Sequence, residues 1–151
     1  MLEPAVGLGH FIGLMPDDLQ ARSRITGIEI DSVTARSAKL LYPDADIRRK
    51  PFEESVLPDG GFDVAVGSVP FGDYKPFDPR FKGWNFLIHD YFFAATLNNV
   101  RPGGFILFIT SKGTLDKQPQ QRTGRQLRVR RFRWQSGISV TKIHQTGVHS
   151  G

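Results

Sequence analysis

The sequence predicts an α/β fold, a doubly wound and mostly parallel sheet with helices on both faces. Through residues 1–117, short apolar strands alternate with stretches of helical spacing, and this alternation is typical of parallel sheets. The strands are near-continuous apolar runs, as in strands that are buried on both faces. At 151 residues, of which 39% are hydrophobic, the chain can form one domain with a core.

Each element follows from a local pattern. β-branched and aromatic runs predict strands at 25–30, 62–67 and 105–110, and a weaker strand at 45–50. Helical spacing predicts helices at 9–19, 32–41 and 85–100, the last being the clearest. In such a sheet, ligands bind at the carboxyl ends of the strands. The loops after residues 3, 29, 50 and 67 are therefore the expected binding region.

The net charge of +5 is unevenly distributed. Residues 1–117 carry 13 Lys and Arg against 15 Asp and Glu, whereas residues 118–151 carry seven basic residues and no acid. We therefore expect a partial globular core over 1–117 and a basic tail over 118–151. For this tail disorder is favoured, and the alternative is a β-hairpin. The hairpin would pair Leu127, Val129, Phe132 and Trp134 with residues 138–143.

Two glycines follow an acid at the start of the chain. Gly7 and Gly9 can bring the backbone close to a ligand, but Ile12 stands where a dinucleotide-binding loop would carry its third glycine. Glu3 would repel a pyrophosphate and attract a cation. Glu29, at the end of the next strand, is suited to accept the two hydroxyls of a ribose. Asp31 lies on the same side of the strand, so a shared role stays open.

Ser68-Val69-Pro70-Phe71 follows the strand at 62–67. Together with Glu3-Pro-Ala-x-Gly-x-Gly and Gly-Ile-Glu-Ile-Asp at 27–31, it resembles the S-adenosylmethionine-dependent adenine-N6 DNA methyltransferases. Arg-Pro-Gly-Gly at 101–104 and the strand after it resemble large, mobile-element-type members of that family. The resemblance covers residues 1–117 and implies a class I methyltransferase (Rossmann-like) sheet. Against that pattern the sheet looks incomplete at both ends, as in a truncated piece of a larger enzyme.

The resemblance also implies a cofactor site for S-adenosyl-L-methionine. Glu29 would bind its ribose, and Phe52 would stack on its adenine. Pro51 stands where the family has an Asp that contacts this adenine, and Glu53 is a replacement in a less suitable position. The residues that would line the methionine part are Glu3, Pro4, Ala5, Gly7 and Gly9.

The tetrapeptide would carry the chemistry. The Ser68 side chain and the carbonyl of Val69 or Pro70 would accept hydrogen bonds from the adenine amino group, and Phe71 would stack on the base. Ser68 replaces the usual Asn or Asp, and its hydroxyl can also donate. Val69 replaces a proline, so we expect a freed N–H and a looser turn.

DNA is the expected partner, with the target adenine flipped out of the duplex. Lys75, Arg80 and Lys82 are candidate phosphate contacts. The same motifs also fit transfer to an RNA base or to a protein glutamine amide. A third interpretation is a non-catalytic fragment that binds nucleic acid through its basic tail. The chain contains no cysteine, which excludes thiolate chemistry and is compatible with a reducing cytoplasm.

Overall fold

The chain forms a seven-stranded sheet with strand order β3-β2-β1-β4-β5-β7-β6. The computed structural model describes residues 1–110, 128–133 and 138–144, the last two ranges as strand backbone only. Strands β1 to β5 pair in parallel, and β7 is antiparallel to both of its neighbours. The strands are β1 (Leu2–Glu3), β2 (Thr26–Glu29), β3 (Asp46–Arg49), β4 (Phe62–Ser68), β5 (Val100–Ile109), β6 (Arg128–Arg133) and β7 (Ile138–His144).

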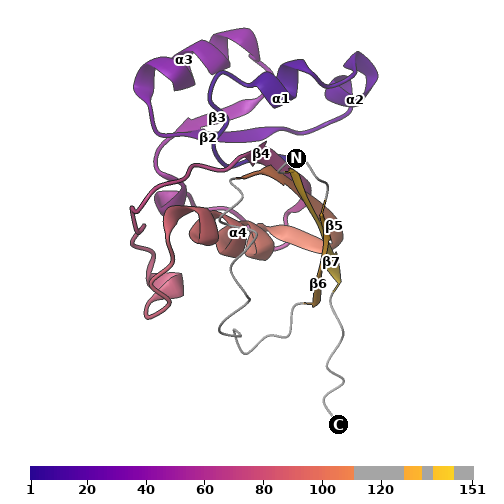
Figure 1. The fold of residues 1–151 in the computed structure, drawn as a ribbon. Coiled ribbons are helices and arrows are strands. Elements are labelled where there is room, and N and C mark those ends of the chain that lie inside the picture. The colour runs from indigo at the N-terminus through magenta and orange to yellow at the C-terminus, as the bar shows by residue number, and fades with distance from the viewer. Residues whose placement is uncertain (111–127, 134–137, 145–151) are drawn as a thin grey trace.

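Helices lie on both sides of this sheet. Figure 1 shows α1 (His10–Gly13), α2 (Asp17–Ala21) and α3 (Ser32–Leu41) on one side and α4 (Ile88–Asn99) on the other. Two short 3₁₀ helices, Phe52–Glu54 and Pro79–Phe81, lie in the connections around β4. The predicted doubly wound α/β fold is confirmed. None of the helices in the described part of the chain is long and apolar enough to cross a membrane.

The core is divided by the sheet into two clusters. Residues of α4 pack with β1, β4 and β5 on one face, where Tyr91, Ala95 and Phe108 are buried. Residues of α1 and α3 pack on the other face, where Ile12 and Ala38 are buried. Both faces of the central strands are therefore covered, which agrees with their apolar sequences.

Two predicted helices have other limits in the structure. The helix expected over 9–19 is two short helices, because Pro16 disfavours the helical conformation at the residue before it and acts as the N-cap of α2. The helix expected over 85–100 begins only at Ile88, after Asn85 with a φ of +50°. By contrast, α3 has the predicted bounds, since Asp31 caps its first turn by accepting from the Thr34 N–H at 2.8 Å.

The basic segment contributes two strands. The backbone of β7 pairs with β5 in the register Ile109 to Ile138, and β6 pairs with β7. Over these strands the structure has the hairpin alternative rather than disorder, and the sheet continues beyond β5, where the sequence led us to expect it to stop. An unpaired β5 edge would expose a row of backbone donors and acceptors, and β7 covers that row. Leu127, Trp134 and the boundary at residue 117 lie outside the described residues, so the domain division stays a prediction.

Candidate active site

Three acidic and polar positions meet at the carboxyl edge of the sheet. Glu3, Glu29 and Ser68 are the last residues of β1, β2 and β4. The strand β1 lies between the other two, with Glu3 paired to Gly27 and Leu2 paired to Ala65. Because these strands are parallel neighbours, their carboxyl ends lie side by side.

The glycine loop is held by Glu29. Gly7 and Gly9 have φ values of +55° and +80°, which residues with a Cβ rarely adopt. The Gly7 N–H donates to one carboxylate oxygen of Glu29 at 2.9 Å, and the Asp31 N–H donates to the other at 2.8 Å. Each carboxylate oxygen has a second lone pair, so Glu29 can order the loop and still accept from a ligand.

Asp31 has a different task from Glu29. It is exposed and caps α3, and the hydrogen bonds from Thr34 lower its pKa. Glu29 is half-buried and lines a cavity at the sheet edge. The shared role that the sequence left open is thus divided between the two acids.

The cavity beside Glu29 has a volume of about 300 Å³, at the lower end of the usual size of small-molecule sites. Residues from both sides of the edge line it. The sequence-predicted site residues among them are Pro4, Ala5, Glu29, Phe52, Glu53 and Pro70. The others are Ile28, Ile30, Lys50, Pro51, Tyr74, Ile88 and Phe92.

The wall formed by the loop after β3 is rigidly packed. Phe52 is buried, with ring centroids 4.9 Å from Phe92 and 5.9 Å from Tyr91. Glu53 accepts a hydrogen bond from the Tyr74 hydroxyl at 3.1 Å, and this carboxylate raises the pKa of Tyr74. The bond connects two walls of the cavity.

Glu3 is a buried carboxyl without a full set of partners. It is 1% exposed, and its Oε2 atom accepts no hydrogen bond within the described part of the chain. A Cβ at Gly67 would lie 3.8 Å from the Glu3 Cγ atom, so the bare backbone of β4 passes close to this side chain. Burial raises the pKa of Glu3 to about 8. An uncompensated buried carboxyl is costly, and a bound cation would relieve that cost.

The tetrapeptide lies partly in the core. Ser68 is exposed at the strand end, Pro70 lines the cavity, and Phe71 is 73% exposed. Val69 is buried, and its N–H donates to the Ile109 carbonyl at 2.9 Å. The expectation of a freed N–H at Val69 is therefore wrong, because the sheet ladder extends one residue past β4.

The three candidate phosphate contacts differ in their surroundings. Arg80 forms an ion pair with the buried Asp78 at 2.6 Å, and the Tyr91 hydroxyl donates to the same carboxylate at 2.8 Å. Burial opposes the ionisation of Asp78, but hydrogen bonds from Arg80 and Tyr91 prevail and lower its pKa. Arg80 thus has a structural partner, whereas Lys75 and Lys82 are exposed.

Sequence reasoning missed several cavity residues. Ile88 and Phe92 are four residues apart, a spacing that places them on one helix face, but the sequence does not show which ligand that face meets. Tyr74 follows the tetrapeptide by three residues, and its partner Glu53 is 21 positions away. No local signal connects this pair.

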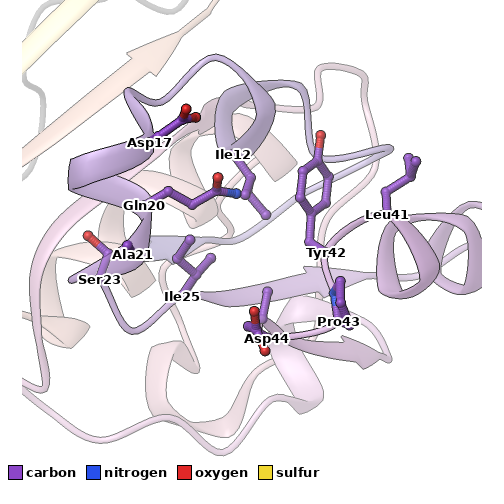
Figure 2. A pocket seen from close by; sticks show the side chains of 11 residues that line it. Ile12, Asp17, Gln20, Ala21, Ser23, Ile25, Leu41, Tyr42, Pro43 and Asp44 are labelled. Atoms are coloured by element: carbon purple, nitrogen blue, oxygen red, sulfur yellow. The ribbon is translucent and has the colours of Figure 1, made fainter.

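A second cavity, of about 480 Å³, lies between α2 and the end of α3. Figure 2 shows Tyr42 standing at its side, between α3 and the helix that carries Ile12. A Cβ at Gly9 would collide with the Tyr42 ring, and one at Gly13 would lie 2.5 Å from its hydroxyl. The Tyr42 side chain therefore packs against Gly9 of the glycine loop and against Gly13 of α1.

Comparisons with known proteins place this geometry in context. No protein-family model matches the chain. Over 117 residues it is 32% identical to the protein named Defense against restriction protein B of Escherichia phage P1, an alignment that covers 72% of the chain and spans only 5% of that protein's length.

Solved structures resemble the chain over more of its length. A proposed class I S-adenosylmethionine-dependent methyltransferase of Listeria monocytogenes superposes with a TM-score of 0.68 at 16% identity, covering 99% of this chain and 54% of its own. A SAM-dependent methyltransferase of Aquifex aeolicus gives a TM-score of 0.60 at 10% identity, covering 94% and 80%. With its strand order and antiparallel β7, the chain has the fold of the class I S-adenosylmethionine-dependent methyltransferases.

Proposed function

We propose that this chain binds S-adenosylmethionine at the carboxyl edge of its sheet and transfers the methyl group to the N6 amino group of adenine in DNA. The observation that carries the proposal is the meeting of Glu3, Glu29 and the tetrapeptide at one edge of the sheet. Glu29 and Pro70 line the cavity at this edge, whereas Glu3, Ser68 and Phe71 lie outside its lining. Had these segments lain on different sides of the fold, no single ligand could contact all three.

The residues present fit this cofactor. Glu3 is a buried carboxyl with one oxygen that no described residue contacts by a hydrogen bond, which suits a ligand that carries a sulfonium and an ammonium charge. The half-buried Glu29 has free lone pairs for two ribose hydroxyls. Phe52 and Ile30 supply apolar cavity walls on which an adenine ring can lie. Each end of the cofactor thus finds side chains of matching chemistry.

Bound S-adenosylmethionine would supply an electrophilic methyl carbon: the S–C bond would break with its electron pair left on sulfur as the N–C bond forms, and the nitrogen would lose its proton to water. The exocyclic nitrogen of adenine is a weak nucleophile because its lone pair is delocalised into the ring. Ser68 Oγ and a neighbouring carbonyl oxygen would accept hydrogen bonds from the two N–H groups of this amino group and stabilise the positive charge that develops on its nitrogen. Phe71 would hold the base in line by stacking.

The phage relative supports DNA as the acceptor. Its name assigns it to defence against restriction, and methylated bases are a chemical means of protecting DNA from a nuclease. The exposed Lys75 and Lys82, close after the tetrapeptide, suit phosphate groups. An adenine in RNA and a glutamine amide present a similar amino group, so these acceptors become outcomes of the test.

The first experiment measures binding of S-adenosylmethionine by calorimetry to the wild type, to Glu29→Gln and to Leu40→Ala. Leu40 is exposed on α3, far from the edge, and serves as the control. Glutamine keeps one oxygen for the glycine loop but loses the charge and an acceptor, so we expect at least a tenfold weaker affinity, or about 1.4 kcal/mol. Equal affinity of Glu29→Gln and wild type would refute the cofactor assignment.

The second experiment offers radiolabelled cofactor with DNA, RNA or a glutamine-containing peptide. Label in DNA, at N6 of adenine after nuclease digestion, is the expected result. Ser68→Asn should raise its rate, because an amide oxygen reaches further than a hydroxyl oxygen and carries no hydrogen of its own. Label in RNA or peptide alone would refute the DNA assignment and leave the cofactor assignment intact.

A further inference from the structure

Three large aromatic side chains are exposed directly after the tetrapeptide. Phe71, Tyr74 and Phe77 are 73%, 58% and 76% exposed, although they lie within seven residues of one another. The next aromatic residues along the chain are packed. Phe81 and Phe86 contact each other with ring centroids 5.9 Å apart, and Phe81 also contacts Tyr91. Among the aromatic residues of 71–93, the exposed rings are therefore those of 71–77.

This segment is anchored at its centre and borders the cavity. The Tyr74 hydroxyl donates to Glu53, and the Tyr74 carbonyl accepts from the Ile88 N–H at 2.8 Å. Tyr74 also lines the cavity together with Pro70. In Figure 1 the connection between β4 and α4 extends beside α4, on the side away from α1, α2 and α3. The aromatic segment thus continues outward from the candidate active site.

Within residues 71–82 two exposed lysines can contact an anionic partner, while Glu53 and Glu54 place negative charge beside Tyr74. Lys75 and Lys82 are exposed, and neither forms an ion pair with any residue that the structure describes. Asp78 is buried and neutralised by Arg80, which leaves Asp73 as the one exposed acid of residues 71–82 with no ion pair to a described residue. Exposed aromatic rings interleaved with lysines are the pattern of proteins that bind unpaired nucleic acid strands.

We propose that Phe71, Tyr74 and Phe77 form a stacking platform for an unpaired DNA strand, on which the flipped target base and its neighbours lie while Lys75 and Lys82 contact the phosphates. The proposal rests on the function proposed above and specifies its substrate as DNA that is locally single-stranded. Every base offers a flat face, so the platform would tolerate sequence changes in the nucleotides beside the target. Phe77 is its distal end, since it does not line the cofactor cavity.

Fluorescence anisotropy with a labelled 12-nucleotide DNA strand, without cofactor, tests this platform. Stacking on an aromatic side chain contributes about 1–3 kcal/mol per base, so Phe77→Ala should weaken binding roughly 5- to 150-fold at fixed salt. Phe77→Tyr should bind as the wild type, because it keeps the ring. Leu40→Ala removes an equally exposed apolar side chain elsewhere and should change nothing. The basic segment after residue 117 is common to all variants and cancels in the ratios.

The same strand annealed to its complement provides the second arm. Duplex DNA presents phosphates but no free base faces, so it should bind more weakly, and Phe77→Ala should leave its affinity unchanged. Equal single-strand affinities of Phe77→Ala and wild type would overturn the platform, as would an equal loss for strand and duplex. Binding of a neutral peptide library with the same Phe77 dependence, and no DNA binding, would assign the rings to a protein partner and also overturn it.

Calorimetry with S-adenosylmethionine on the same variants separates the two proposals. Phe77→Ala should retain wild-type cofactor affinity. A wild type that binds the strand in a Phe77-dependent way but fails to bind the cofactor would refute methyl transfer and leave the strand-binding platform supported. A wild type that binds the cofactor but not the strand would refute the strand-binding platform and leave the cofactor assignment supported.

Discussion

Replacing Glu3 by glutamine should stabilise the protein at alkaline pH and leave its stability near pH 4 unchanged. Burial raises the pKa of Glu3 from 4.5 to about 8. In the unfolded chain the same carboxyl ionises near its ordinary value, so between these two pH values the folded protein binds more protons than the unfolded protein. The free energy of unfolding therefore falls as pH rises through this window.

The size of the effect follows from the two pKa values. A difference of about 3.5 units corresponds to about 5 kcal/mol once the pH exceeds both values. Native domains are stable by only about 5–15 kcal/mol, so a buried ionised Glu3 would remove a large part of the total. Glutamine has the shape of the protonated acid and never ionises, and the variant avoids this loss.

Urea unfolding followed by circular dichroism at pH 5, 7 and 9 measures the effect. The stability difference between Glu3→Gln and wild type should be small at pH 5 and widen to several kcal/mol at pH 9. Glu54→Gln is the matched control, because Glu54 is exposed in the loop after β3. A difference that stays constant from pH 5 to pH 9 would refute the reasoning, since it would show that Glu3 ionises alike in both states.

Three further predictions concern the site and its supports. Affinity for S-adenosylmethionine should rise roughly tenfold per pH unit between pH 5.5 and 7.5, as Glu3 deprotonates to meet the cation, and Glu3→Gln should flatten this calorimetric profile; an unchanged slope in the variant would exclude Glu3 as the partner. Tyr91→Phe removes the hydroxyl that donates to Asp78 and should cost about 1.5–3 kcal/mol in urea unfolding; an unchanged midpoint would show the bond to be dispensable. Gly9→Ala should destabilise more than Gly83→Ala, because both positions have positive φ but only Gly9 faces the Tyr42 ring; equal losses in thermal unfolding would argue against that packing.

The stability prediction and the binding prediction both follow from the raised pKa of the Glu3 carboxyl. Ionised Glu3 costs stability because its charge has no partner among the described residues, and it suits a cationic ligand for the same reason. The glycine loop, by contrast, is already ordered by Glu29 through the Gly7 N–H. The site thus combines a preformed loop with a buried carboxyl whose ionisation a bound cation would favour.

Local rules predicted the elements whose signals lie within a few residues. The bounds of α3 follow from Asp31 as a cap, and β4 follows from a run of apolar residues. The motif order placed Glu3, Glu29 and Ser68 at strand ends, and parallel pairing alone then brings them to one edge. Alternation and capping depend on neighbours in the chain, so the sequence was sufficient for them.

Tertiary structure decided what depends on distant partners. The basic segment reads as disordered by composition, yet β7 pairs with β5, because backbone hydrogen bonding to an open edge does not depend on side-chain charge. The bond from Tyr74 to Glu53, the bond from Tyr91 to Asp78 and the packing that buries Glu3 and raises its pKa all depend on residues that only folding brings together. The sequence by itself determined which chemical groups stand at the edge of the sheet, and the packing around them determined which are exposed, which are paired and which ionise only at raised pH.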